Sequence, residues 1–208
     1  MLKKPIPSSA SDPLVLSGDE PFARGSKRHC YVHPANAALC VKVAARADGP
    51  ECHAQQRLDL EDHALLKKRG EEAMFDRIPE IEGVVETDLG PGIVMRMYRD
   101  ADGRISRNLA DVIRERGLSP ALDRAIEDLK QWQRTHRLLT RDSGPHNVLA
   151  VRAGDDAWSL VIAEGWQNRR QRWLARLHPR FERYLIGRQL NKFDRRVAHL
   201  LKVHRDGA

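Results

Sequence analysis

The chain has 208 residues, of which 41% are hydrophobic and 31% are charged, and its formal net charge is +7. This length and composition are typical of a globular protein with one domain or two small lobes around a real core. No apolar run approaches the roughly 18 residues of a membrane-spanning helix, and the basic N-terminus lacks the apolar stretch of a secretory signal.

Residues 1–13 are rich in Ser and Pro and are predicted to be disordered. Short apolar or alternating segments then predict three strands in series. They lie at residues 14–16 (resuming near 21–23), 29–33 and 38–44.

A segment without Pro or Gly, from Glu51 to Arg69, predicts a helix that ends at Gly70. Its apolar residues near one face are Leu58, Leu65 and Leu66. Two further strands, at residues 84–87 and 92–98, read as a hairpin around residues 88–91. The N-terminal half is thus predicted to hold five antiparallel strands with one helix after the third.

The hydrophobic period changes near Tyr98–Arg104, which predicts a boundary between residues 14–99 and a mainly helical C-terminal half, residues 100–208. Asn108 and Gly117 are suited to cap a short helix. Ser119 and Pro120 are typical of the start of a longer helix. The buried stripe predicted for that helix is Leu122, Ala125, Ile126, Leu129 and Trp132.

A polar loop, residues 138–149, follows the longer helix and holds Asp142 and Asn147. A loop pinned at both ends can present catalytic side chains, although Asp and Asn are also ordinary turn formers. Two strands at residues 147–152 and 157–163 then predict a hairpin. The tail from about Arg169 is predicted to be helical and basic.

Positive charge gathers in this C-terminal third. Between Gln167 and Arg205 ten Arg and two Lys stand against Glu182 and Asp194, a net charge of +10, so the remainder carries −3. Such a segment favours an anionic partner, such as a phosphorylated substrate, an anionic lipid or nucleic acid. A solvated helical face is the alternative. No stacking-aromatic or groove-reading motif accompanies the charge, so nucleic acid ranks last.

The cysteines are three in number and have no CxxC spacing: Cys30, Cys40 and Cys52. They are predicted to be reduced, buried thiols of a cytoplasmic protein. Neighbouring histidines could complete a zinc site with them, but the paired ligand spacing of such sites is missing.

Five strands with a helix after the third, then a helical half with a polar loop and a hairpin, is the order of a protein-kinase-like chain. The predicted fold is therefore α+β, with a five-stranded N-terminal lobe and a reduced helical C-terminal lobe. Particular segments resemble the PhoP regulatory network YrbL family, a small group of bacterial kinase-like proteins, over roughly residues 14–185. These segments are Val32-His33-Pro34, Cys40-Val41-Lys42-Val43, Ile78-Pro79, Val85-Glu86-Thr87-Asp88 and Pro145-His146-Asn147-Val148-Leu149.

The resemblance implies an ATP- and Mg²⁺-binding site. Asp142 stands at the position of the catalytic base, and Lys42 at that of the lysine that pairs with nucleotide phosphates. Asn147 and Glu164 stand at the metal-binding positions. Further nucleotide-site residues implied in this way are Gly25, in a degenerate glycine-rich loop, Met97, and either Asp59 or Glu61 as the acid that holds Lys42.

Several departures from active kinases leave a catalytically weak or inactive pseudokinase, acting as a regulatory or scaffold protein, as the alternative. The glycine-rich loop has one glycine, with Arg24, Lys27 and Arg28 as basic side chains that could substitute for backbone contacts. Glu164 replaces Asp and lengthens the metal-binding arm. Only 43 residues follow Gly165, so a protein substrate bound in the usual way is not expected, and the phosphate acceptor stays unknown.

Overall fold

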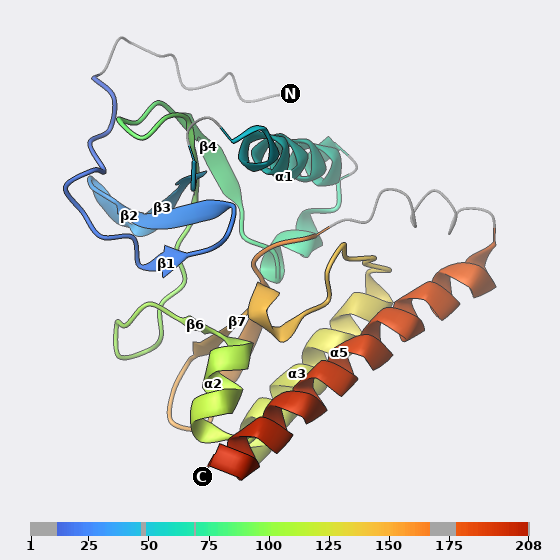
Figure 1. Ribbon diagram of the computed structural model, residues 1–208. Helices are drawn as coiled ribbons and strands as arrows, with labels where there is room; N and C mark the ends of the chain where they lie inside the picture. Colours follow the sequence, from blue (N-terminus) through green and yellow to red (C-terminus); the bar gives the residue numbers. More distant parts are fainter. Residues whose placement is uncertain (1–11, 47–48, 69, 167–177, 208) are drawn as a thin grey trace. The chain divides into compact units, whose positions relative to one another are not determined.

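The computed structural model describes residues 12–46, 49–68, 70–166 and 178–207. They form two compact units (Figure 1). The first comprises the described parts of Met1–Arg69 together with Pro79–Met97, and the second comprises Gly70–Ile78 and the described parts of Tyr98–Ala208. The segment Gly70–Ile78 thus packs with the second unit although the first unit surrounds it in sequence. The predicted disorder at residues 1–13 falls almost entirely on residues outside the described ranges.

The first unit is built on a five-stranded antiparallel sheet with the strand order β1-β2-β3-β5-β4. Its strands are β1 (Ala23–Arg24), β2 (Arg28–His33), β3 (Asn36–Ala44), β4 (Ile81–Val85) and β5 (Gly92–Arg96). A single helix, α1 (Pro50–Lys68), follows the third strand. The α+β class and the predicted order of five strands and one helix are confirmed.

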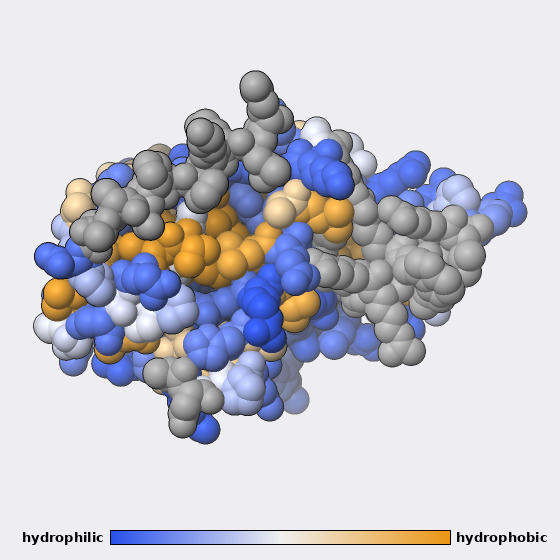
Figure 2. Space-filling model, turned by 90° about the horizontal axis from the view of Figure 1, so that it is seen from above, coloured by the Kyte–Doolittle hydropathy of each residue, from blue (hydrophilic) through white to orange (hydrophobic). Residues whose placement is uncertain are grey.

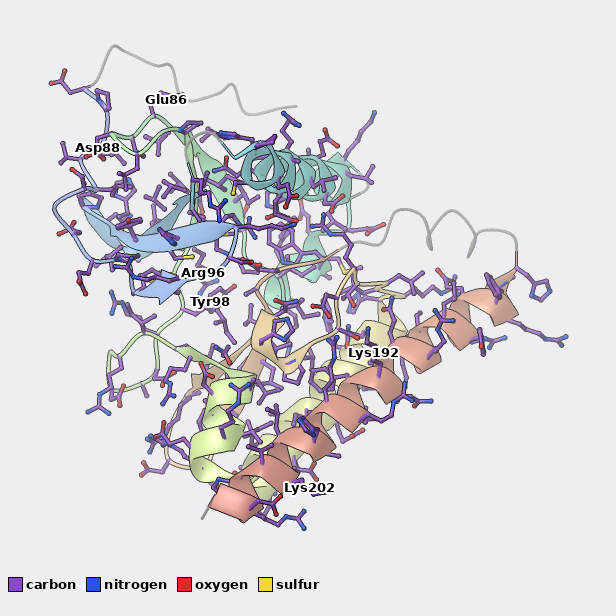
Figure 3. All side chains as sticks on the ribbon, in the orientation of Figure 1. Glu86, Asp88, Arg96, Tyr98, Lys192 and Lys202 are labelled. Atoms are coloured by element: carbon purple, nitrogen blue, oxygen red, sulfur yellow. The ribbon has the colours of Figure 1, made fainter. Side chains whose placement is uncertain are left out.

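The predicted strand at residues 14–16 is wrong. Leu14 makes an isolated bridge to Thr87, and the N–H groups of Leu16 and Ser17 donate to the Asp88 carboxylate at 2.7 and 3.1 Å. This segment is therefore tied to the β4–β5 connection, near which Figure 3 labels Asp88. A side-chain acceptor takes the backbone donors that a neighbouring strand would otherwise take.

The core of this sheet is apolar and contains Leu16, Tyr31, Val41, Val43 and Val94. A Cβ atom at Gly92 would lie 2.6 Å from Val41 Cγ1. Glycine at this position therefore allows the β5 backbone to approach the side chains of β3.

The buried face of α1 is unexpectedly polar. Its polar side chains can be buried because they form hydrogen bonds with the sheet. Gln56 Nε2 donates to the Lys42 carbonyl at 3.3 Å and to the Pro91 carbonyl at 2.9 Å. His63 Nε2 accepts from the Ile81 N–H at 2.9 Å. Burial, and then the charge of Lys67, lowers the pKa of His63 to about 4, which keeps this nitrogen an acceptor at neutral pH. Side chains of α1 thus fix it to β3 and β4.

The second unit combines helices with a small antiparallel sheet of order β6-β7-β8. Its helices are η1 (Glu72–Asp76), α2 (Leu109–Arg116), α3 (Pro120–Thr135), η2 (Pro145–Asn147) and α5 (Pro179–Gly207), and its strands are β6 (Arg107–Asn108), β7 (Val148–Arg152) and β8 (Trp158–Ile162). The predicted β7–β8 hairpin is confirmed, with Val148 paired to Ile162.

Local signals fix both helix starts in this unit. Asn108 Oδ1 accepts from the Asp111 N–H at 2.9 Å, and Ser119 Oγ accepts from the Leu122 N–H at 3.2 Å. Both predicted caps are confirmed. Trp132 is the member of the predicted α3 stripe that is only half-buried, and its ring lies 4.9 Å from that of His136.

The long helix α5 lies alongside α2 and α3 (Figure 1). Leu185, Ile186 and Leu190 of α5 pack with Leu139 in one apolar cluster. Lys130 of α3 is buried and binds Asp194 of α5 at 2.8 Å. The predicted basic helical tail is confirmed from Pro179 onwards, while its part at residues 169–177 lies outside the described residues.

In the view of Figure 2 the described residues are mainly hydrophilic, with hydrophobic residues in patches between them. Among the helices that the structure describes, none has the length and apolar character needed to cross a bilayer.

Candidate active site

The loop between α3 and β7 is held in place by α5. The Thr140 N–H and hydroxyl donate to Gln189 Oε1 at 3.1 and 3.3 Å, and Gln189 Nε2 donates back to the Thr140 carbonyl at 2.8 Å. The hydroxyl of Ser143 reaches the Gln189 carbonyl at 3.3 Å. Thr140 is buried and serves as the anchor of the loop. Sequence reasoning missed Gln189, since nothing in a helical pattern marks a glutamine 49 residues away as its partner.

The loop and the end of β8 form one assembly. Asn147 Nδ2 donates to the Asp142 carbonyl at 3.3 Å. The Arg141 N–H donates to the Gly165 carbonyl at 2.7 Å, and the Ala163 N–H donates to the Asn147 carbonyl at 2.8 Å. The structure therefore brings Asp142, Asn147 and the residues on both sides of Glu164 together.

Gly165 makes this close approach possible. Its φ of +72° lies in the left-handed region, which favours glycine. A Cβ atom there would lie 3.3 Å from the Asp142 nitrogen. Trp166 follows, fully buried, and its Nε1 donates to the Ile162 carbonyl at 2.8 Å. The turn after β8 is thus fixed on both sides of Gly165.

The Asp142 carboxylate is contacted by two side chains, Arg196 and His146. Arg196 Nη1 of α5 lies 2.6 Å from Oδ1, and His146 Nε2 lies 3.1 Å from Oδ2. Burial alone would raise the pKa of Asp142, but the hydrogen bond and charge of Arg196, with help from His146, lower it below its usual range. Asp142 is therefore ionised at neutral pH and is a weak proton acceptor whose main capacity is to orient a hydroxyl.

Gly144 leaves the space that these partners occupy. A Cβ atom at position 144 would lie 2.2 Å from His146 Cε1 and 2.7 Å from Arg196 Nη1. Sequence reasoning missed Arg196, because it lies 54 residues from Asp142.

The donor set at Asn147 and Glu164 fits a hard divalent cation. The Asn147 side-chain nitrogen donates to the Asp142 carbonyl. This bond orients the side-chain amide and leaves the Asn147 side-chain oxygen as an acceptor. One amide oxygen and one carboxylate suit Mg²⁺, which usually takes one or two protein ligands and completes its shell with phosphates and water. Within the described ranges, no group of three or more His, Cys, Asp or Glu side chains could hold a metal ion, which leaves the zinc alternative without a site there.

In the first unit, Lys42 is buried on β3 and pairs in the sheet with Cys30 and Ile93. Its backbone carbonyl is bound by Gln56 of α1 at 3.3 Å. Asp59, three residues further along α1, is buried as well, whereas Glu61 is exposed. The buried face of α1 therefore includes Asp59 and not Glu61. Asp62 of the same helix is also buried.

Asp59 forms a buried ion pair with Arg28, and Gln55 Nε2 donates to its other oxygen at 3.0 Å. The expectation that Arg28 could stand in for phosphate contacts of the glycine-rich loop is therefore wrong, because its guanidinium is committed to α1. Gly25 lies in the β1–β2 turn, where its N–H donates to the Arg28 carbonyl at 2.8 Å. Met97 is buried at the end of the same unit, and its N–H donates to the Ala38 carbonyl at 2.8 Å.

Known proteins similar to this chain include members of one family. The family model described as PhoP regulatory network protein YrbL matches residues 14–198. The YrbL proteins of Escherichia coli (strain K12) and Shigella flexneri are each 32% identical to the chain over 155 residues, which is 73% of this chain and 72% of theirs. Among solved structures, Rad53 residues 1–466 in complex with AMP-PNP aligns with a TM-score of 0.45 at 14% identity, and the alignment covers 83% of this chain but only 46% of that one. On the family match and the two relatives, the chain belongs to the PhoP regulatory network protein YrbL family.

Proposed function

We propose that this protein is a phosphotransferase that binds ATP with Mg²⁺ and transfers the γ-phosphoryl group to a hydroxyl of a small acceptor. One observation carries the proposal. The Asp142 loop is joined to the segment around Glu164 by two hydrogen bonds, Arg141 to Gly165 and Ala163 to Asn147, and a third, Asn147 to Asp142, ties the loop to itself. The partly exposed Asp142 carboxylate, an amide oxygen from Asn147 and a carboxylate from Glu164 are the group types that support the proposal, because Mg²⁺ prefers oxygen ligands of these kinds.

Each residue has a role in this proposal. Asp142 orients the acceptor hydroxyl and receives its proton as the new ester forms. Asn147 and Glu164 hold Mg²⁺, which would neutralise charge on the transferred group. Lys42 supplies a fixed positive charge to the nucleotide phosphates, and Asp59, on the buried face of α1, is favoured over Glu61 as the acid that positions it. Gly25 and Met97 complete the nucleotide site.

The second candidate is a pseudokinase that acts as a regulatory or scaffold protein. Two observations favour it: Arg196 already occupies the Asp142 carboxylate at 2.6 Å, and the buried Arg28 is paired with Asp59.

In either case a cytoplasmic protein is proposed. The cysteines of the described residues are free thiols, and burial raises the pKa of Cys40 to about 11, which suits an unreactive thiol in a reducing compartment.

Nucleotide and metal binding separate these candidates in a thermal-shift measurement of the full chain. With ATP and Mg²⁺ at about 100 times Kd, we expect a stabilisation of about 2.7 kcal/mol, and a clearly smaller shift with ATP and EDTA. A shift of the same size with ATP and Mg²⁺ as with ATP and EDTA would favour a nucleotide-binding pseudokinase. No shift under either condition would leave only a scaffold. Lys42→Met serves as the matched variant and is expected to lose most of the shift, since a charge within the nucleotide site is removed.

A further inference from the structure

A cavity of about 510 Å³ lies between α2, η2 and α5, entirely within the second unit. This volume is in the range of small-molecule sites. Its polar lining residues are Arg114, His146, Lys192, Arg195, Arg196 and His199. None of the described residues that line it is acidic. Four of these six side chains are Arg or Lys, so basic side chains gather around one concave site.

Two of the lining cations are paired with carboxylates, Arg114 with Asp111 at 2.6 Å and Arg196 with Asp142 at 2.6 Å, and two others are not, among the described residues. Asp194, next to Arg195 in sequence, is turned toward α3, where it binds Lys130 at 2.8 Å. Lys192, Arg195 and His199 are exposed and lie at helical spacings of three and four residues on α5. The like charges of Lys192 and Arg195, three residues apart, destabilise a helix. Among the described residues, neither Lys192 nor Arg195 has a carboxylate partner that would relieve this repulsion, whereas a bound anion would relieve it.

The walls around the cavity are fixed by contacts between elements. His204 Nδ1 of α5 lies 2.7 Å from the Arg114 carbonyl of α2, and α2, η2 and α5 all contact one another. Lys192 projects from α5, well separated along the helix from Lys202 near its C-terminal end (Figure 3). The basic side chains of the cavity thus extend from helices that are packed together, so the backbone of the site needs little ordering when a ligand binds.

Two of the lining residues are the partners of Asp142. Arg196 Nη1 lies 2.6 Å from Asp142 Oδ1 and His146 Nε2 lies 3.1 Å from Asp142 Oδ2. A ligand anchored by Lys192 and Arg195 is therefore held next to the side chains that contact the carboxylate. The binding energy from a charged group of the ligand, away from the reacting atoms, can then position a hydroxyl of the same ligand for reaction.

We propose that this cavity binds the phosphate group of a small phosphate monoester whose hydroxyl is the acceptor in the reaction proposed above. Lys192, Arg195 and His199 bind the phosphate, and the hydroxyl is presented to Asp142. The hydroxyl oxygen forms a bond to the γ-phosphorus of ATP, the bond from that phosphorus to the bridging oxygen of ADP breaks, and the hydroxyl proton passes to Asp142. The acceptor role rests on the proposed function, while anion binding in the cavity does not.

The experiment uses inorganic phosphate as the probe, without ATP or Mg²⁺, on the full chain at about 0.15 M NaCl, where exposed charges further away than about 8 Å are screened. Binding is followed by isothermal titration for wild type and for the double variant Lys192→Gln/Arg195→Gln. The matched control is Arg188→Gln/Lys202→Gln, which removes the same charge from exposed positions of α5 that do not line the cavity. Melting curves establish that both variants are folded.

We expect saturable phosphate binding to wild type, about tenfold or more weakening in the cavity variant because two charge-assisted contacts are lost, and less than about twofold change in the control. Equal weakening in both variants, or no saturable binding to wild type, would overturn the proposal. Cavity-specific phosphate binding in a protein that ATP with Mg²⁺ does not stabilise would support the anion site and contradict the kinase function. Stabilisation by ATP with Mg²⁺ in a protein that does not bind phosphate would support the kinase function and contradict the anion site.

Discussion

Replacing Asp142 by Asn is expected to lower Mg²⁺-dependent ATP turnover by about 10²- to 10⁴-fold, the usual contribution of a positioned general acid or base. The amide keeps the size of the side chain but removes the negative charge that Arg196 now balances. Because the interaction with the hydroxyl proton is made in the transition state, the loss should fall on kcat, with little change in KM for ATP. Turnover is measured by phosphate or ADP release under saturating ATP.

The control for this variant is Asp155→Asn, on the exposed β7–β8 turn of the same unit. It makes the same chemical change away from the site, and its turnover should equal that of wild type. A thermal shift with ATP that is preserved in Asp142→Asn would show that nucleotide binding survives. Unchanged turnover in Asp142→Asn would remove Asp142 from the catalytic machinery.

Replacing Asp59 by Ala is expected to lower the free energy of unfolding by about 3 to 5 kcal/mol, the cost of breaking a buried ion pair from one side. The side chains of Arg28 and Asp59 are only 4% and 3% exposed, so the remaining guanidinium would stay charged with little solvent. Such a loss would lower Tm by about 10 °C in a chain of this size. Chemical denaturation monitored by circular dichroism measures the change.

Two controls separate this effect from ordinary surface chemistry. Glu80→Ala breaks the Lys67–Glu80 pair, whose side chains are 46% and 45% exposed, and should cost less than about 1 kcal/mol. The double variant Arg28→Met/Asp59→Leu removes both charges and should regain much of the lost stability, because apolar replacement of a buried pair is often neutral or better. A small effect of Asp59→Ala, similar to that of Glu80→Ala, would contradict the buried pairing.

The parts of the fold that were predictable from the sequence depend on short-range signals. Asn108 and Ser119 cap α2 and α3 through bonds to residues three positions ahead, so the signal lies within four residues. The β7–β8 hairpin follows in the same way from alternating residues around a short polar turn. The Asp142 loop was found because its Asp and Asn stand at a recognisable spacing between a helix and a strand.

Side-chain partners far apart in sequence could not be predicted. Arg196 reaches Asp142 across 54 residues, and Arg28 reaches Asp59 across 31. Helical periodicity indicates a face of a helix but does not name what that face meets. The strand predicted at residues 14–16 failed for a related reason, since Asp88, more than 70 residues away, accepts its backbone donors.

The buried polar face of α1 was not predicted, because hydrophobic periodicity identifies the buried face of a helix from its apolar residues alone. Leu58 and Leu65 are only half-buried, whereas Gln56, Asp59 and His63 are buried and hydrogen-bonded to other elements. The choice between Asp59 and Glu61 as the partner of Lys42 depended on this face. The sequence left it open; Asp59 lies on the buried face and Glu61 on the exposed one, and the pairing with Lys42 stays a prediction.

The most direct test of the proposed phosphotransferase follows the γ-phosphate of ATP by ³¹P NMR in the presence of the wild-type chain and a mixture of small phosphate monoesters that carry free hydroxyls. With Mg²⁺, we predict that the γ-phosphate signal declines as ADP and a new phosphate-ester signal appear, and that EDTA stops this change. A γ-phosphate signal that persists with Mg²⁺, in a protein that ATP nevertheless stabilises, would contradict catalysis and establish the pseudokinase.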